Sequence, residues 1–158
     1  IAARAEASQT DLVLAARAAR LAGSERASDY RVRARVPSPE NIAAEIASAD
    51  AALRARNWRE AIAAYERVIE ATGENNVLVL NNFAYALGEA GNRRRALEYA
   101  KKALALAPDN PSVLDTAGWL MVQTDGDREA AIRLLEKAAR LAPKNRTIAE
   151  HLRLAKAD

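Results

Sequence analysis

A short turn signature recurs four times along the chain, and its spacing constrains the fold more than any other feature of the sequence. The four copies, separated by 34, 35 and 35 residues, are Pro39-Glu40-Asn41, Gly73-Glu74-Asn75, Pro108-Asp109-Asn110 and Pro143-Lys144-Asn145. Twelve residues before each turn stands an alanine, at Ala27, Ala61, Ala96 and Ala131. Two independent markers in one register indicate tandem repeats of a single supersecondary unit.

Each unit divides into two amphipathic stretches at helical spacing. In residues 77–90, one apolar face at i, i+3, i+4 and i+7 is formed by Leu80, Phe83, Ala84 and Leu87. Gly91 interrupts this pattern, and a second apolar stripe runs from Ala96 to Leu104 and ends before Pro108. The repeating unit is therefore predicted to be a helical hairpin.

Polar residues mark the expected helix starts. Asn92 is suited to cap the helix that follows Gly91. Asn57 and Glu60 have the spacing of a capping box, in which Asn57 accepts from the Glu60 amide and the Glu60 side chain returns to Asn57. The run from Asp125 to Glu129 begins like a calcium loop but lacks the glycine and the distal glutamate, so a turn and an N-cap are favoured.

The two ends of the chain are less regular than its middle. Leu12 to Ala22 is typical of a helix, but Tyr30 to Val36 alternates apolar and charged residues, as a strand does. Register with the later turns favours a helix in that segment, and both alternatives stay open. After the last turn, residues 146–157 are expected to form a helix that covers the final hairpin, since repeat arrays need capped ends.

Composition narrows the chemistry that such a chain can perform. Half of the residues are apolar but only 4% are aromatic, which favours closely packed helices. There is no cysteine and one histidine, so a disulfide framework, a thiolate zinc site and a histidine-rich metal cluster are excluded. The net charge of +3 is too small to indicate a nucleic-acid-binding protein. We expect no cofactor, no metal and no nucleic-acid partner.

Catalysis and membrane insertion are also not expected. No nucleophile, carboxylate pair or phosphate-binding loop converges on these helices, so the protein is predicted not to be an enzyme. His151 stands on the terminal helix and is interpreted as an ordinary helix position. The longest uncharged stretch, residues 75–88, is too short and polar to cross a bilayer, and residues 1–30 show no signal-peptide pattern.

The repeats resemble the tetratricopeptide repeat, a 34-residue helix-turn-helix unit. From Ile42 to Asn145 the small, aromatic and proline positions of that motif are matched by Ala49, Ala61, Tyr65, Ala84, Ala96, Ala103, Pro108, Gly118, Ala131, Ala138 and Pro143. Upstream, the match rests on Ala15, Ala27, Ala34 and Pro39. The resemblance implies an all-α fold, a right-handed α-solenoid of helical hairpins with a C-terminal capping helix. We expect a single domain over residues 1–158, with a degenerate repeat at 8–41, repeats at 42–75, 76–110 and 111–145, and the cap at 146–158.

A narrower resemblance concerns the segments 81–86 and 113–120. They are similar to the C-terminal repeats of bacterial cell-envelope lipoproteins of this family, including those associated with exopolysaccharide and protein-sorting loci. This implies a periplasmic or envelope-associated location, with the cytoplasm left open because the lipid-bearing cysteine of such proteins is not in the sequence. The chaperone-binding subclass fits poorly: Asn82 matches one clamp asparagine, but no lysine precedes Lys101.

The first helix of each hairpin is expected to line a concave groove, because the second helix packs outside it. Helical spacing predicts that nine side chains face this groove: Asp50, Arg54, Asn81, Asn82, Tyr85, Glu89, Asp115, Trp119 and Gln123. Amides can bond a peptide backbone in both directions, and Tyr and Trp supply rigid contact area. Tyr85 and Trp119 have a second interpretation, as packing residues between neighbouring units.

The predicted function is a non-enzymatic scaffold that binds a peptide or partner segment in this groove. The family resemblance places it in a bacterial envelope, secretion or polysaccharide assembly. The alternative is a structural spacer, or an array that self-associates through the apolar ends of its repeats.

Overall fold

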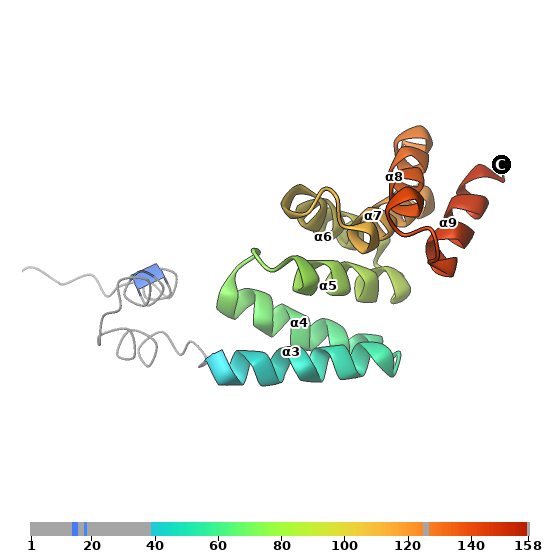
Figure 1. Cartoon of the computed structure of the whole chain (residues 1–158). Helices are drawn as coiled ribbons and strands as arrows, with labels where there is room; N and C mark the ends of the chain where they lie inside the picture. Colours follow the sequence, from blue (N-terminus) through green and yellow to red (C-terminus); the bar gives the residue numbers. More distant parts are fainter. Residues whose placement is uncertain (1–13, 16–17, 19–38, 125–126, 158) are drawn as a thin grey trace, which may run out of the picture. The chain divides into compact units, whose positions relative to one another are not determined.

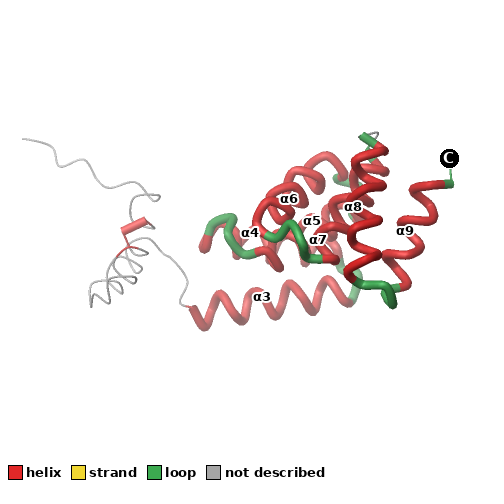
Figure 2. The backbone as a smooth tube through the Cα atoms, turned by 45° about the horizontal axis from the view of Figure 1, so that its top comes forward, coloured by secondary structure: helices red, strands yellow, loops and turns green. Residues whose placement is uncertain are grey.

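The computed structural model describes residues 14, 15, 18, 39–124 and 127–157. From residue 39 onward these residues form seven helices and no strand (Figures 1 and 2): α3 (Pro39–Arg54), α4 (Trp58–Thr72), α5 (Val77–Glu89), α6 (Arg93–Leu106), α7 (Pro111–Gln123), α8 (Arg128–Leu141) and α9 (Arg146–Lys156). The predicted all-α class is confirmed. The helix or strand alternatives for residues 30–36 fall outside the described residues, and so does nearly all of the degenerate repeat.

By its internal contacts the chain divides into two compact units, Ile1–Ala44 and Glu45–Asp158. The second unit holds the end of α3 and every later helix. The expected repeat boundaries stay a prediction, with one difference at the start of α3. This helix begins at Pro39, so the first copy of the turn signature is a helical turn rather than a connection. Proline suits the first position of a helix because it has no N–H that would be left unpaired there.

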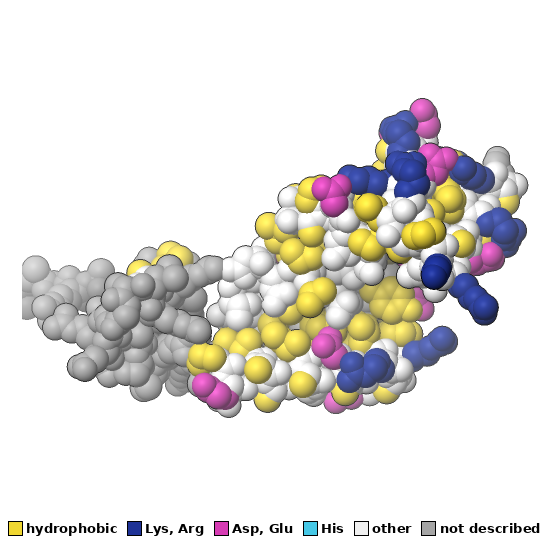
Figure 3. Space-filling model, viewed as in Figure 1, with side chains coloured by type: hydrophobic (Ala, Val, Ile, Leu, Met, Phe, Trp, Pro, Cys, Tyr) yellow, Lys and Arg dark blue, Asp and Glu magenta, His cyan; other side chains and the backbone are white. Residues whose placement is uncertain are grey.

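Within the second unit, consecutive helices pack as hairpins that stack on one another. α5 packs against α6 and α7 against α8, while α5 also contacts α7, and α7 contacts α9. The helices α5, α7 and α9 therefore form one layer, as expected for the first helices of tandem hairpins. In the view of Figure 3, acidic and basic side chains are interspersed over α8, whereas the surface around α5 shows hydrophobic side chains together with other uncharged or backbone atoms.

Three asparagines start the helices of this layer in the same way. Asn76, Asn110 and Asn145 each accept hydrogen bonds at Oδ1 from the second and third amides of α5, α7 and α9. The equivalent of Asn110 is thus Asn76 and not Asn75, so these two caps are 34 residues apart although the corresponding turn signatures are 35 apart. Equal caps give the three helices the same register of inward-facing side chains.

The starts of the second helices differ from this scheme. Asp127 caps α8 by accepting from the amide of Ala130 at 2.9 Å. Asn92 stands at the predicted N-cap of α6 but makes no side-chain cap hydrogen bond. The predicted capping box at Asn57 forms only in part: the Glu60 side chain returns to Asn57, whose Nδ2 donates to Oε2 of Glu60 at 2.6 Å, but the Asn57 side chain caps no amide.

Small residues let the helices approach closely, as the repeat pattern predicted. Ala49, Ala61, Ala84, Ala96 and their later equivalents are fully buried. A Cβ atom on Gly118 would lie 2.9 Å from Cγ of Leu135 and 3.0 Å from the carbonyl oxygen of Ala131, so α7 and α8 pack almost backbone to backbone there.

The C-terminal helix covers the last hairpin. Ile148 is buried against Leu114 and Ala138, which come from the two helices of that hairpin. The predicted capping helix is therefore confirmed. Among the described residues, no helix has the length and apolar character needed to traverse a bilayer.

Candidate functional site

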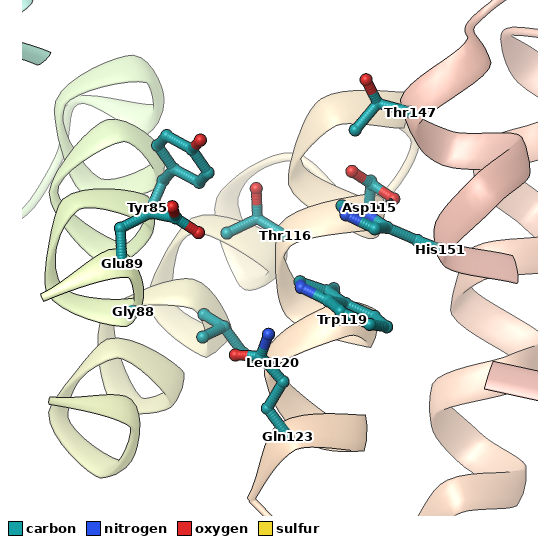
Figure 4. A pocket seen from close by; sticks show the side chains of 10 residues that line it. All are labelled: Tyr85, Gly88, Glu89, Asp115, Thr116, Trp119, Leu120, Gln123, Thr147 and His151. Carbon is teal, nitrogen blue, oxygen red and sulfur yellow. Dashed lines mark hydrogen bonds and ion pairs between the residues drawn. The ribbon is translucent and has the colours of Figure 1, made fainter. Parts of the chain in front are cut away.

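A cavity of about 160 Å³ opens between the first helices α5, α7 and α9 (Figure 4). Its lining residues are Tyr85, Gly88, Glu89, Asp115, Thr116, Trp119, Leu120, Gln123, Thr147 and His151. A cavity of about 150 Å³ is enough to hold a benzene molecule. The space therefore suits one side chain of a ligand, with the rest of the ligand on the open surface around it.

The common N-caps explain why the same kinds of position converge on the cavity. Tyr85 and Trp119 each stand nine residues after the asparagine that caps their helix, and Glu89 and Gln123 stand thirteen after it. Equal distances from equal caps place these pairs on the same face of α5 and α7. Gly88 lets the helices meet, because a Cβ atom there would lie 2.8 Å from Cδ2 of Leu120.

Trp119 is held in place by the capping helix. Its ring stacks on His151 with centroids 4.4 Å apart and planes only 3° from parallel. His151 Nδ1 lies 2.9 Å from Oδ1 of Asp115, which is one turn before Trp119 on α7. A carboxylate oxygen accepts hydrogen bonds, so this contact suits the tautomer of His151 that carries its proton on Nδ1. The two contacts fix the indole at the wall between α7 and α9.

Tyr85 forms the opposite wall of the cavity. It remains 43% exposed, and its ring meets Trp58 of α4 edge to face with centroids 6.0 Å apart. Partial burial, and secondarily the charge of Glu89, raise the pKa of the Tyr85 hydroxyl, against the opposing charge of Arg56. The hydroxyl is therefore neutral at pH 7 and can both donate and accept.

Tyr85 and Trp119 thus fit both interpretations, as groove residues and as packing residues between neighbouring units. Each packs one part of its ring against a neighbouring helix, and each lines the cavity with another part. Packing of this kind fixes the rotamer of a side chain before a ligand arrives.

Asp50 and Asn82 lie outside the cavity and contact one another. Asn82 Nδ2 donates to Oδ1 of Asp50 at 3.2 Å, and the hydroxyl of the buried Tyr65 donates to the same oxygen. Burial raises the pKa of Tyr65 well above its ordinary value, and the hydrogen bond to Asp50 adds to the shift. These side chains connect α3, α4 and α5 to one another.

The remaining two predicted groove residues also lie away from the cavity lining. Arg54 is exposed at the end of α3. Asn81 is only 9% exposed, and its Oδ1 has no hydrogen-bond partner among the described residues. Five of the nine predicted side chains therefore gather at one cavity, namely Tyr85, Glu89, Asp115, Trp119 and Gln123.

Sequence reasoning missed His151 as a site residue because it treated α9 only as an apolar cap. The signal was present in the spacing. His151 stands six residues after Asn145, as Asn82 stands six after Asn76, and each bonds an aspartate of an earlier first helix. Extending the groove register into α9 would have included His151. Across the part of the chain that the structure describes, no group of three His, Asp or Glu side chains could hold a metal ion.

Comparison with known proteins agrees with this architecture. Residues 78–110 match the family model of the tetratricopeptide repeat. Three solved structures share the fold. The Arabidopsis OM64 TPR domain has a TM-score of 0.67 and 20% identity, with 74% of this chain and 95% of that chain covered. The second TPR domain of human RPAP3, in complex with the HSP70 peptide SGPTIEEVD, has a TM-score of 0.63 and 20% identity, covering 74% and 99%.

The third structure is the complex of the TPR2B domain of yeast Sti1 with pHsp70, which has a TM-score of 0.62 and 18% identity over 72% of this chain and 94% of that chain. No curated protein matches the sequence. The described helices thus form a solenoid of helical hairpins that contains one matched tetratricopeptide repeat and shares the fold of tetratricopeptide-repeat domains, in agreement with the predicted resemblance. The resemblance to bacterial cell-envelope lipoproteins stays a prediction.

Proposed function

We propose that the protein is a non-enzymatic interaction module, and that a segment of a partner polypeptide lies across α5, α7 and α9 with one side chain in the cavity. The observation that carries this proposal is the cavity itself. Side chains from two repeats and from the capping helix converge there around two aromatic rings, at the positions that the repeat register assigns to the groove.

The state of these rings before binding supports the proposal. Trp119 is immobilised by His151, and Tyr85 is supported by Trp58, so neither ring has much rotational freedom to lose when a ligand binds. Pre-organised aromatic side chains at the centre of an interface contribute most of the affinity in many complexes. In the human RPAP3 and yeast Sti1 structures the same fold is seen with a bound partner, which agrees with this use of the groove.

The finer part of the proposal is a role in a bacterial envelope, secretion or polysaccharide assembly. It rests on the sequence resemblance of residues 81–86 and 113–120. The competing function, self-association as a spacer or array, is tested by light scattering over a range of protein concentrations. A mass that stays monomeric contradicts self-association.

Panning a library of random twelve-residue peptides against the chain tests the binding proposal. We expect enriched peptides that bind the parent protein and lose at least tenfold in affinity to a variant carrying Tyr85→Ala and Gln123→Ala. The matched control carries Leu106→Ala and Leu141→Ala, two leucines that are each 49% exposed on second helices. Both variants are first compared with the parent by circular dichroism. Failure to enrich any peptide, or equal binding by the groove variant, would contradict the proposal.

A further inference from the structure

The cavity has a charge opposite to that of the whole chain. The chain carries a net charge of +3, but the residues that line the cavity include Glu89 and Asp115 and no lysine or arginine. Glu89 reaches from α5 with its carboxylate directed toward α7, while Asp115 lies on α7 beside His151 (Figure 4). A cation in this space would meet carboxylates from two different helices.

The bond between His151 and Asp115 uses one oxygen of that carboxylate, Oδ1, and Glu89 is not part of it. The side chain of Asp115 is 13% exposed, so water screens its charge less than it would on an open surface. Arg56, whose charge acts on Tyr85, is exposed after the end of α3 and does not line the cavity.

Aromatic walls add a second attraction for a cation. Tyr85 and Trp119 both line the space, and a cation over such a ring is attracted by the negative charge of its face. Gln123 and Thr116 supply oxygen acceptors at the same cavity. Carboxylates, π faces and neutral acceptors are all groups that bind a flat cationic donor.

We propose that the cavity holds the side chain of an arginine from the bound polypeptide, an inference that rests on the proposed function. A guanidinium is planar, so it can stack on an aromatic wall while its five N–H groups bond the carboxylate of Glu89 and the nearby acceptors. A lysine ammonium is a compact and strongly hydrated charge with no planar face to stack on the ring and no fork of donors to match a carboxylate. The partner is therefore a basic peptide segment.

The acidity of the cavity also predicts what it rejects. The HSP70 peptide in the human RPAP3 complex ends in two glutamates, a valine and an aspartate. Its side chains would meet Glu89 and Asp115 as like charges. This protein should bind that peptide much more weakly than an arginine-containing one.

The experiment uses the peptides enriched from the twelve-residue library, whose affinities are measured by isothermal titration calorimetry on the full chain. We expect arginine to be enriched over its frequency in the input library. Replacing that arginine with citrulline, which keeps the shape and removes the charge, should weaken binding at least tenfold. Replacement with lysine should weaken it less than citrulline does, and replacement with glutamate should abolish it.

A charge-matched pair of variants locates the effect. Glu89→Gln should weaken the arginine peptide several-fold and leave the citrulline peptide unchanged, because the interaction lost is the same in both cases. Glu98→Gln removes the same charge from an exposed position on α6 and should change neither affinity. Circular dichroism of both variants confirms that they keep their helices.

The outcomes separate the two proposals. Peptides that depend on Tyr85 and Gln123 but show no arginine enrichment, or that tolerate citrulline, would overturn the arginine proposal and leave the binding function standing. Equal affinity for the lysine peptide would overturn the preference for arginine. If no peptide depends on Tyr85 and Gln123, the proposed function itself fails.

Discussion

Gly118 controls how closely two helices approach. The atoms that a Cβ on this residue would meet include the backbone carbonyl of Ala131, which cannot rotate away. A Cβ on Gly88 would be crowded by the end of the flexible Leu120 side chain, and Cβ of Ala96 would lie at an ordinary contact distance of 3.9 Å. Both glycines lie inside helices, where glycine is itself unfavourable by about 1 kcal/mol relative to alanine. Gly118 and Gly88 therefore differ in the atoms that an added Cβ would meet, and not in the helix propensity lost by having glycine there.

Alanine substitution should separate these effects. We expect Gly118→Ala to lower the free energy of unfolding by about 1 to 3 kcal/mol through overpacking. Gly88→Ala should cost less, because Leu120 can change rotamer and the helix gains propensity. Urea denaturation followed by circular dichroism measures both. An equal loss in the two variants would show that contact with the backbone is not the deciding factor.

Tyr65 links stability to alkaline pH. Burial raises its pKa in the folded protein, whereas the unfolded chain releases the proton near the ordinary tyrosine value of about 10. Above that pH the unfolded state binds fewer protons than the folded state, so the free energy of unfolding falls as pH rises. Tyr65→Phe removes this contribution and should show a shallower decline than the parent between about pH 9 and 11. Parallel declines in urea titrations over that range would contradict the prediction.

At the scale of the helix, asparagine caps decide the register of the layer formed by α5, α7 and α9. Asn76, Asn110 and Asn145 each accept two amide hydrogen bonds, while Asn92 occupies an N-cap without making any. An asparagine at the N-cap position therefore makes side-chain cap hydrogen bonds at some helix starts of this chain and none at another. This difference supplies a matched pair of positions for substitution.

Asn110→Ala should lower the free energy of unfolding by about 1 kcal/mol, the usual cost of losing a side-chain cap. Asn92→Ala should change it by a few tenths at most, since no cap hydrogen bond is lost. Both values come from urea midpoints at constant m-value. Similar losses at the two positions would mean that the caps contribute little to stability.

At the scale of the whole molecule, each hairpin is stabilised mainly by its neighbours in sequence. The C-terminal helix is the last such neighbour, and Ile148 is its buried contact with Leu114 and Ala138. Stability in a repeat array is close to a sum of units and nearest-neighbour interfaces, so damage at an end remains local. The same helix also supplies His151 to the cavity.

Ile148→Ala should therefore raise amide hydrogen exchange in α8 and α9 more than in α4 and α5. The expected loss is about 2 to 5 kcal/mol at the affected interface. Mass spectrometry of the exchanged peptides measures its location. A uniform rise across α4 to α9 would show that the described helices unfold as one cooperative unit instead.

Much of the layer formed by α5, α7 and α9 was predictable from the sequence, because repetition supplies several copies of one pattern. Helix starts after Gly73, Pro108 and Pro143 and the stripes around Ala84 and Gly118 each follow from local spacing. The direction of individual side chains did not follow in the same way. Asn57 donates to Glu60 and caps no amide. An asparagine side chain carries both a donor and an acceptor, and the local sequence does not decide which of them is used.

By itself, the sequence determined that the described part of the chain from residue 39 onward is helical, that its hairpins repeat, and which face of α5 and α7 is directed toward a groove. Those properties depend on residues close in the chain, so a periodic pattern contains them. Tertiary structure decided that Asp50 and Asn82 bond each other and that His151 supports Trp119 at an acidic cavity. These contacts join residues more than thirty positions apart, and their geometry depends on how far neighbouring hairpins are displaced, a quantity that no local spacing encodes.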